Sequence, residues 1–294
     1  MPTHDRPPRV VLVTGASSGI GEAAAHRFAR RGDHLVLLAR GREALERVAR
    51  DCDTLGAAST TVTPADISRD DEVEAAVGTT MARHGWIDTV IGSAGVVAYG
   101  QVQDVPAEVF DQVVATNLLG SVNLARHVLP VMRTQGAGSL VVVGSVIGHI
   151  VVPDMAAYVV SKWGVRALVR QLQVDNRDCP GVRIEYVAPG GVDTPIYRQA
   201  ATYGDAAGRP PFPVTGPERI ADRTLAVADG RRSGGQVGLA NEVIRLGFSA
   251  LPWAYDRLVG PMFSVAAQDQ TVAVEPDPGN VLRSRQEHNG LRGG

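Results

Sequence analysis

The sequence predicts an α/β fold in which helices cover both faces of a doubly wound parallel sheet. Three observations support this prediction. From residue 9 to about residue 190, short apolar segments alternate regularly with longer segments of helical spacing. The short segments are apolar nearly throughout, as expected of strands buried on both faces. Gly32 and Gly85 stand directly after predicted helices. Such alternation, with right-handed crossovers, produces an open parallel sheet.

The predicted elements follow one another in chain order. The strands are Val10–Thr14, Leu35–Ala39, Thr60–Thr63, Ile87–Ile91, Leu140–Gly144 and Arg183–Ala188. The helices between them are Glu22–Arg31, Arg42–Thr54, Asp70–His84, Ala107–Thr134 and Ala156–Cys179. Beyond Pro189, a helix is expected over Pro217–Asp229 and a last strand over Gln236–Ala240.

One domain is expected over residues 9–266, because a 294-residue chain that is 44% hydrophobic can bury a substantial core. Residues 195–216, rich in Pro, Gly, Ala and Tyr, are expected to form a mobile substrate flap. A C-terminal extension, residues 241–266, is expected to form one or two amphipathic helices packed on the core. The alternatives to core packing are that this extension covers the substrate pocket, forms an interface or touches a membrane surface. Residues 1–8 are expected to be flexible and residues 267–294 to be a disordered tail.

The bulk properties argue against several classes of partner. A net charge of −2 and a pI near 6.4 give no basic footprint for nucleic acid. No apolar run approaches the roughly 20 residues that span a bilayer, and the N-terminus lacks a cleavable signal pattern. The two cysteines, Cys52 and Cys179, lie far apart and lack metal-ligand spacing, which suggests free thiols in the cytoplasm.

A glycine-rich turn follows the first predicted strand and leads directly into a helix. Its glycines are Gly15, Gly19 and Gly21. Glycines let the backbone approach a pyrophosphate closely, and the free amides and the dipole of the helix N-terminus favour negative charge. A purely structural tight turn is the alternative. The position of the turn, at the first strand–helix junction, favours a dinucleotide site.

The end of the second predicted strand indicates which dinucleotide is bound. An acidic residue there would hold a ribose 2′-hydroxyl, whereas an arginine accommodates a 2′-phosphate. The strand ends at Ala39-Arg40, and the nearest acidic residue, Glu43, falls inside the next helix. Arg40 therefore favours NADP(H) over NAD(H), unless it is simply a solvated charge at the start of a helix.

Tyr158 and Lys162 stand four residues apart on a predicted helix, and hence on one face. A nearby ammonium stabilises a phenolate and is expected to lower the pKa of the tyrosine, as an acid/base that acts on a carbonyl or an alcohol requires. Lys162 is the only lysine among 29 basic residues, the rest being arginine. An accidental surface pair is therefore the weaker interpretation.

Two further polar residues occupy suggestive positions. Ser145 follows a predicted strand, at the sheet edge where open parallel sheets place their ligands, and its hydroxyl can hydrogen-bond a substrate oxygen. A simple turn serine is the alternative. Asn117 lies within a predicted helix, where asparagine is mildly unfavourable, and it either holds a water or bends the helix.

Together these residues resemble the motif set of the classical short-chain dehydrogenases/reductases. The matching segments are Thr14-Gly15 to Gly21, Asn117, Ser145, Tyr158-x-x-x-Lys162 and Pro189-Gly190 to Thr194, in the order of the family and over roughly residues 9–200. The resemblance implies a Rossmann-type sheet and hydride transfer between a nicotinamide and a carbonyl or alcohol carbon. It also implies a homodimer or homotetramer.

The resemblance also implies roles for individual residues. Tyr158 would be the acid/base, Ser145 would position the substrate, Lys162 would tune the tyrosine and bind the nicotinamide ribose, and Asn117 would organise a relay water. Asp66 would contact adenine and Thr194 the carboxamide. The full set of expected cofactor contacts is Gly15, Ser17, Ser18, Gly19, Ile20, Gly21, Arg40, Asp66, Ile67, Ser93, Ala94, Gly95, Tyr158, Lys162, Pro189, Gly190, Val192 and Thr194.

Two features depart from the family pattern. The Asn-Asn-Ala-Gly motif after the fourth strand is replaced by Gly92-Ser93-Ala94-Gly95, so the asparagine amides that brace the sheet are missing. Reduced local rigidity or cofactor affinity is the expected consequence. The C-terminal part also lacks the final glycine-rich strand of the compact tetrameric members.

The sequence therefore predicts an NADP(H)-dependent carbonyl reductase or alcohol dehydrogenase acting on a medium-sized, mostly apolar substrate. Residues expected near the substrate are Val146, His149, Val151, Tyr197, Tyr203 and Phe212. Two alternatives are a non-catalytic NADP(H)-binding scaffold or redox sensor, and an epimerase or dehydratase of the same family. A scaffold would have no physical need for the tyrosine–lysine pair.

Overall fold

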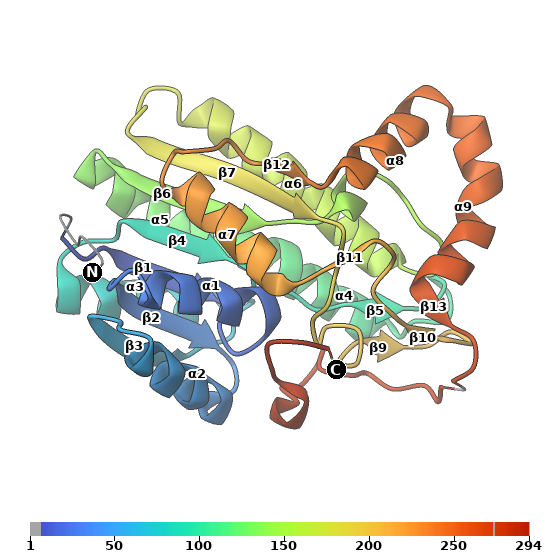
Figure 1. Ribbon diagram of the computed structural model, residues 1–294, viewed down its shortest axis with the longest axis horizontal. Coiled ribbons are helices and arrows are strands. Elements are labelled where there is room, and N and C mark those ends of the chain that lie inside the picture. Colours follow the sequence, from blue (N-terminus) through green and yellow to red (C-terminus); the bar gives the residue numbers. More distant parts are fainter. Residues whose placement is uncertain (1–6, 273, 294) are drawn as a thin grey trace.

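Seven parallel strands form the central sheet, in the order β12-β7-β6-β4-β1-β2-β3 (Figure 1). The computed structural model describes residues 7–272 and 274–293. The strands of the sheet are β1 (Val10–Thr14), β2 (His34–Ala39), β3 (Ser59–Pro64), β4 (Thr89–Gly92), β6 (Gly138–Val143), β7 (Val182–Pro189) and β12 (Gly235–Val237). The chain runs outward from β1 to β3 and then returns to β4 on the other side of β1. This reversal of strand order confirms the predicted doubly wound sheet.

Helices cover both faces of this sheet. Helices α1 (Gly19–Ala29), α2 (Arg42–Thr54) and α7 (Pro217–Ala228) pack on one face. Helices α3 (Asp70–His84), α5 (Gly120–Gln135) and α6 (Ala156–Asp175) pack on the other. Helix α4 (Ala107–Val114) precedes α5 and contacts α6.

The strand register explains why the predicted strands are apolar nearly throughout. In β1, Leu12 pairs with Val36 on one side and Val90 on the other, and all three face the α3, α5 and α6 layer. Their neighbours Val11 and Val13 face the opposite layer. Every position of this strand is therefore buried, as a central parallel strand requires.

Several element boundaries differ from the predicted ones. The long helix predicted over Ala107–Thr134 is interrupted by a π-helical turn, Ala115–Leu119, and α6 ends at Asp175 rather than at Cys179. The strand predicted over Gln236–Ala240 is wrong at its end, because Gly238 has a φ of +107° and helix α8 (Leu239–Ala250) begins directly after it.

The expected flap, residues 195–216, is held by short strand pairings. These strands are β9 (Ala201–Thr202), β10 (Ala207–Gly208) and β11 (Val214–Thr215), which pair with β5 (Ala98–Tyr99), β13 (Gln268–Asp269) and β8 (Gly191–Val192), respectively.

Only the end of the C-terminal extension packs on the core, whereas the favoured expectation had the helices of the extension packed there. Helices α8 and α9 (Pro252–Ala267) project from the domain as an antiparallel pair (Figure 1). Only Asn241 of α8 and Phe263 and Ala267 of α9 are buried. Trp253 at the tip is 73% exposed.

Most of the chain beyond α9 is ordered, in contrast to the expected disordered tail. Residues 277–293 return along the domain and pass the carboxyl ends of β1 and β2 (Figure 1). Val281 within this segment is fully buried. Polar composition alone had suggested disorder, but the segment gains its order from long-range hydrogen bonds that composition does not reveal.

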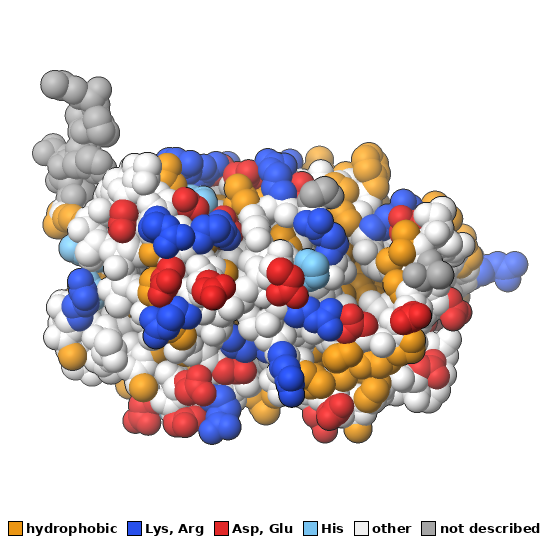
Figure 2. All heavy atoms as spheres, turned by 90° about the horizontal axis from the view of Figure 1, so that it is seen from below, with side chains coloured by type: hydrophobic (Ala, Val, Ile, Leu, Met, Phe, Trp, Pro, Cys, Tyr) orange, Lys and Arg blue, Asp and Glu red, His pale blue; other side chains and the backbone are white. Residues whose placement is uncertain are grey.

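Charged side chains of both signs are interspersed on the face shown in Figure 2, and the basic ones do not gather into one patch. Among residues 7–272 and 274–293, none of the helices has the length and apolar character needed to cross a bilayer.

Candidate active site

The turn between β1 and α1 packs closely against the segment that follows β4. Gly15 has a φ of +66°, and a Cβ at this position would lie 2.8 Å from the main chain of Ala94. A Cβ at Gly21 would lie 2.2 Å from the carbonyl oxygen of Gly15. Side chains at these two positions would collide with the main chain, so only glycine allows the turn to pack this closely.

The ends of β1 and β4 are braced in a way that the sequence analysis did not anticipate. The Ser93 hydroxyl donates to the Thr14 carbonyl oxygen at 2.6 Å. The Thr14 hydroxyl accepts from the amides of Ser93 and Ala94, at 3.1 and 3.3 Å. A serine–threonine pair thus links the two strands where the family pattern has asparagine amides.

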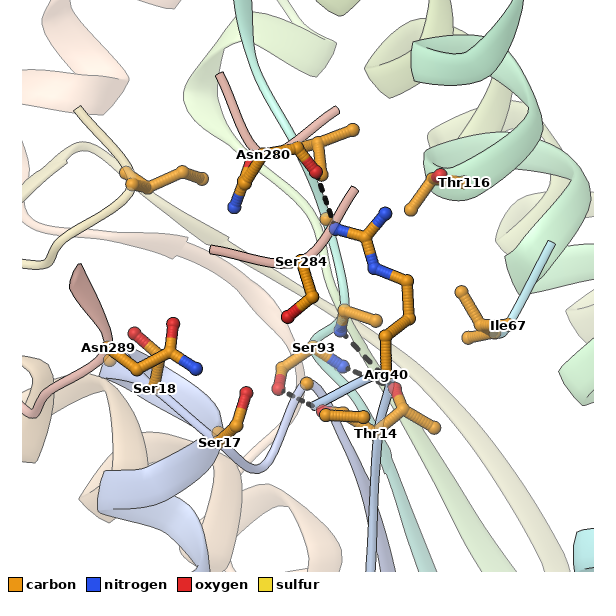
Figure 3. Close-up of a pocket in the computed structure, with 18 of the residues that line it drawn as sticks. Thr14, Ser17, Ser18, Arg40, Ile67, Ser93, Thr116, Asn280, Ser284 and Asn289 are labelled. Atoms are coloured by element: carbon orange, nitrogen blue, oxygen red, sulfur yellow. Dashed lines mark hydrogen bonds between the residues drawn. The ribbon is translucent and has the colours of Figure 1, made fainter. Parts of the chain in front are cut away.

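A cleft runs across the carboxyl ends of the strands, beside the reversal of strand order between β1 and β4 (Figure 3). We call it the glycine-turn cleft. Residues predicted from the sequence that line it are Gly15, Ser17, Ser18, Gly19, Ile20, Gly21, Arg40, Asp66, Ile67, Ser93, Ala94, Gly95 and Thr194. Asn280, Ser284, Arg285 and Asn289, from the C-terminal segment, line it as well and were not anticipated.

The guanidinium of Arg40 points into this cleft and is already engaged. Its Nη1 donates to the carbonyl oxygen of Val281 at 3.1 Å, and its Nη2 donates to that of Asn280 at 2.5 Å (Figure 3). Arg40 is therefore not a solvated surface charge.

A second, mostly apolar cleft adjoins the first, and we call it the apolar cleft. It shares Ile20, Ser93, Gly95, Thr194 and Ile196 with the glycine-turn cleft. Its other lining residues are Val97, Tyr99, Val143, Gly144, Ser145, Val146, Ile147, Met155, Tyr158, Lys162, Pro189, Gly190, Val192, Tyr197, Pro211, Phe263 and Ala267. Phe263 and Ala267 show that the extension contributes to this cleft.

Tyr158 and Lys162 lie side by side in the lining of the apolar cleft. Both are almost fully buried, at 8% and 6% exposure, and the Lys162 Nζ lies 5.6 Å from the centre of the Tyr158 ring. The ammonium donates to the carbonyl oxygen of Val143 at 3.3 Å. Burial lowers the pKa of Lys162 to about 8, because the charged form loses hydration.

The predicted lowering of the tyrosine pKa is not found. Burial raises the pKa of Tyr158, and nearby Tyr197 acts in the same direction. A hydrogen bond with Ser145 opposes this shift but does not outweigh it. Desolvation dominates here over the stabilisation of the phenolate by the neighbouring ammonium, which was the basis of the prediction.

Ser145 is fixed by a tyrosine that sequence analysis missed. The Tyr186 hydroxyl accepts from the Ser145 amide and donates to the Ser145 carbonyl oxygen, each at 3.1 Å. The Ser145 hydroxyl accepts from the amide of Ile147 at 3.2 Å. No residue type at position 186 alone could have revealed this contact, because it depends on the pairing of β6 with β7.

Asn117 lies in the π-helical turn and joins two parts of the site. Its side chain exchanges hydrogen bonds of 2.8 and 2.9 Å with the main chain of Val96. Its Nδ2 also donates to the Ser161 hydroxyl at 3.0 Å, which in turn donates to the Tyr158 carbonyl oxygen at 2.8 Å. Asn117 therefore links the helix that bears Tyr158 to the segment after β4. π-Helical turns often occur at functional sites.

Some residues expected near the substrate lie elsewhere. Val146 and Tyr197 line the apolar cleft, whereas His149, Val151, Tyr203 and Phe212 do not. Phe212 is 84% exposed. His149 stacks obliquely near Tyr186, and burial lowers its pKa to about 4.

Comparisons with known proteins agree with this geometry. Residues 9–203 match the short chain dehydrogenase family. The chain is 38% identical to 2-(R)-hydroxypropyl-CoM dehydrogenase of Xanthobacter autotrophicus over 191 residues, covering 64% of this chain and 76% of the relative. It is 35% identical to sepiapterin reductase of Chlorobaculum tepidum over 195 residues, covering 64% and 79%.

A solved structure is similar over more of the chain. The alcohol dehydrogenase of the archaeon Thermococcus sibiricus, complexed with 5-hydroxy-NADP, superposes with a TM-score of 0.68 at 28% identity, covering 79% of this chain and 95% of that one. By its sequence match, its seven-stranded parallel sheet and its relatives, the chain belongs to the short-chain dehydrogenase/reductase family of oxidoreductases.

Proposed function

We propose that the protein is an NADP(H)-dependent oxidoreductase that interconverts a carbonyl and a secondary alcohol on a medium-sized, mostly apolar substrate. The observation that carries the proposal is the continuity of the two clefts. Ser145, Tyr158 and Lys162 line an apolar cleft that opens directly into the glycine-turn cleft.

The residues of the glycine-turn cleft fit a nicotinamide dinucleotide. The turn packs so closely that it needs glycine at positions 15 and 21, and it lines the cleft at the start of α1, where helix amides and the helix dipole favour a pyrophosphate. Asp66 and Ile67, after β3, border the part of the cleft where an adenine would lie. The printed title of the Thermococcus structure, with its NADP derivative, supports the same cofactor class.

NADP(H) is preferred over NAD(H) in this proposal because of Arg40. Its guanidinium enters the cleft at the end of β2, where a ribose 2′-phosphate would be recognised by a fixed positive charge. NAD(H) offers no group at that position for the arginine to hold.

In the proposed mechanism, each side chain of the site either transfers a proton or holds a reacting group in position. A bound nicotinamide would supply or accept the hydride. Tyr158 donates its phenolic proton to the oxygen of the carbonyl being reduced, and its raised pKa keeps the phenol protonated beforehand. Ser145 donates to the same oxygen and limits its developing charge. Below about pH 8 Lys162 is an ammonium, which stabilises the phenolate that Tyr158 becomes. Asn117 holds the Tyr158 helix in register.

The apolar cleft sets the substrate class. Val97, Ile147, Met155 and Phe263 surround the space in front of Tyr158. These side chains offer dispersion contacts and hardly any hydrogen bonds, so they favour an apolar body with a single polar oxygen.

Purified protein incubated with NADPH and a panel of ketones, from cyclic to branched aliphatic, tests the proposal. Net NADPH oxidation with at least one ketone, and slower oxidation of NADH, is the expected result. Cofactor binding without turnover across the panel would favour a scaffold or sensor. Conversion of an alcohol substrate without net cofactor change would favour an epimerase or dehydratase.

Association and location are proposed from other residues. Val160, Trp163 and Val174 are partly exposed on α6, which supports a homodimer through this helix, or a homotetramer. Cys52 and Cys179 are free thiols, which supports a reducing compartment such as the cytoplasm. Light scattering of the purified protein measures the oligomeric state.

A further inference from the structure

The last residues of the chain occupy groups that a dinucleotide would need. We call residues 277–293 the C-terminal strap. The amide of Gly19, the first residue of α1, donates to the carbonyl oxygen of Gly290 at 2.9 Å. The hydroxyl of Ser18 donates to the same oxygen at 3.2 Å. The strap therefore places a carbonyl oxygen against the N-terminus of α1, where a phosphate oxygen would bind.

A second group is taken at the other end of the cleft. Both terminal nitrogens of Arg40 donate to strap carbonyl oxygens, those of Asn280 and Val281. The arginine that would hold a ribose 2′-phosphate thus already gives one hydrogen bond from each terminal nitrogen to the main chain of the strap. Figure 3 shows Asn280 at this guanidinium and Asn289 beside Ser18. The strap engages both ends of the glycine-turn cleft.

The strap is fastened unevenly along its length. Its first part is firmly anchored, because Asp277 pairs with Thr202 through both main-chain hydrogen bonds and Val281 is fully buried against Ala201 and its neighbours. Its last part is held mainly by polar contacts near the surface. Arg292 pairs with Glu218 at 2.9 Å and with Asp193 at 3.4 Å, and these three side chains are 30–54% exposed.

Because the last part of the strap is held more weakly than the first, it is the part that can move out of the cleft. Exposed ion pairs contribute little to stability and are readily exchanged for water. Leu291 is partly buried against the α1 face and is the main apolar contact of the last part. Residues 283–293 can therefore detach while Val281 stays in place.

We propose that the last part of the C-terminal strap, residues 283–293, is an autoinhibitory segment that competes with the dinucleotide for Gly19 and Ser18, while Asn280 and Val281 stay at Arg40. The inference rests on the proposed cofactor. Cofactor binding then requires residues 283–293 to leave the glycine-turn cleft, and the apparent affinity is reduced by the fraction of molecules whose strap is closed.

Deletion of residues 283–294 tests the competition while leaving the Val281 anchor intact. NADPH binding is measured by stopped-flow fluorescence and by titration for the full chain and for the deletion variant, after unfolding curves have shown that both are folded. The expected result is faster association and an apparent Kd lower by about tenfold, if the closed strap outweighs the open one by that factor. Unchanged or weaker binding in the deletion variant would overturn the proposal.

A milder variant checks the same point without shortening the chain. Arg292→Ala removes the ion pairs with Glu218 and Asp193 and is expected to tighten NADPH binding in the same direction as the deletion, but less. Arg133→Ala is the matched control, since Arg133, on α5 and away from the cleft, forms an exposed ion pair with Asp178. Equal effects of the two substitutions would contradict a specific role of the strap.

Hydrogen exchange provides a readout that is independent of turnover. Addition of NADPH to the full chain is expected to speed the exchange of amides in residues 283–293, because the strap is displaced. Slower exchange there would show that the strap closes over the cofactor instead, and would overturn the competition. If neither the full chain nor the deletion variant binds NADPH or NADH, the proposed function fails together with this inference. If both bind equally, only the strap proposal fails.

Discussion

The hydroxyl of Tyr186 bridges the main-chain amide and carbonyl of Ser145, with both hydrogen bonds 3.1 Å long. The ring reaches this position because Gly144 and Gly148 leave space for it. A Cβ at Gly144 would lie 2.0 Å from Cζ of the ring, and one at Gly148 would lie 2.4 Å from the hydroxyl. One buried tyrosine on β7 thereby fixes the loop that follows β6 and carries Ser145.

Tyr186→Phe is therefore expected to destabilise the protein and to impair the site. The substitution leaves the Ser145 amide without its partner, at a cost of about 1–3 kcal/mol, while the carbonyl oxygen still accepts from the Gly148 amide at 3.0 Å. Urea unfolding measures the loss, and ketone reduction is expected to slow because Ser145 is no longer held. Tyr255→Phe is the control, since that hydroxyl bonds the Val151 carbonyl at an exposed position. A cost no larger than that of the control would contradict the bridge.

Tyr158→Phe is expected to abolish turnover while leaving NADPH binding within a few fold. The variant keeps the ring and its packing but loses the proton that the carbonyl oxygen must receive. A positioned general acid typically contributes about 10²–10⁴ in rate. Single-turnover kinetics and cofactor titration separate the two effects. Tyr197→Phe, which removes another buried phenol from the apolar cleft, serves as the control. Substantial activity in Tyr158→Phe would remove this residue from the mechanism.

Lys162→Met is expected to be inactive and yet more stable than the parent at neutral pH. Burial lowers the pKa of Lys162 in the folded protein to about 8, from 10.5 for a lysine in water. Between these two values the unfolded chain binds more protons than the folded one, so the stability of the parent rises with pH through this window. Below pH 8 the full penalty applies, of the order of 3 kcal/mol.

The stability difference between Lys162→Met and the parent thus depends on pH with a definite sign. The variant is expected to be more stable than the parent at pH 6–7. This difference in unfolding free energy should shrink from about pH 8 upward and vanish near pH 10.5. Urea unfolding at a series of pH values measures it. A constant difference across this range would mean that the buried amine does not titrate as proposed.

Arg40→Asp is expected to shift cofactor preference towards NADH. The aspartate repels a 2′-phosphate and can accept a hydrogen bond from a ribose 2′-hydroxyl. Loss of a charge-assisted contact of about 1.5–3 kcal/mol corresponds to roughly 10–100-fold in the ratio of kcat/KM for NADPH to that for NADH. Because both cofactors face the same C-terminal strap, the ratio separates 2′-phosphate recognition from release of the strap. An unchanged ratio would show that the phosphate binds elsewhere.

The parts of the fold that sequence predicted well are those set by local pattern. The continuous apolar run of Val10–Thr14 and the helical spacing of Arg42–Thr54 gave the observed boundaries, because burial on both faces or on one face leaves a direct mark on the sequence. The glycine turn and the Tyr158–Lys162 spacing were visible for the same reason.

Long-range contacts explain what the sequence could not predict. The contact of Tyr186 with Ser145 spans 41 positions, and that of Arg40 with Val281 spans 241. The raised pKa of Tyr158 likewise follows from burial by distant segments. The tail had the composition of a disordered segment, and only its partners elsewhere in the chain give it structure.

Ser93→Ala is expected to loosen the glycine-turn cleft, because Ser93 replaces the asparagine brace of the family pattern. The substitution removes the 2.6 Å hydrogen bond to the Thr14 carbonyl oxygen, which ties β4 to β1 directly before Gly15. A loss of about 0.5–1.5 kcal/mol in unfolding free energy and weaker NADPH binding by a few fold should accompany it.

Thr54→Ala is the control, since its hydroxyl also donates to a carbonyl oxygen, that of Arg50, at an exposed position away from the cleft. Ser93→Asn is the complementary test, because it places at this position the asparagine amide that the family pattern has there, and this amide is expected to link the two strands as well. If Ser93→Ala bound NADPH as tightly as the parent, the two strand ends would not depend on this hydroxyl, and the brace would have to reside in the Thr14 hydroxyl alone.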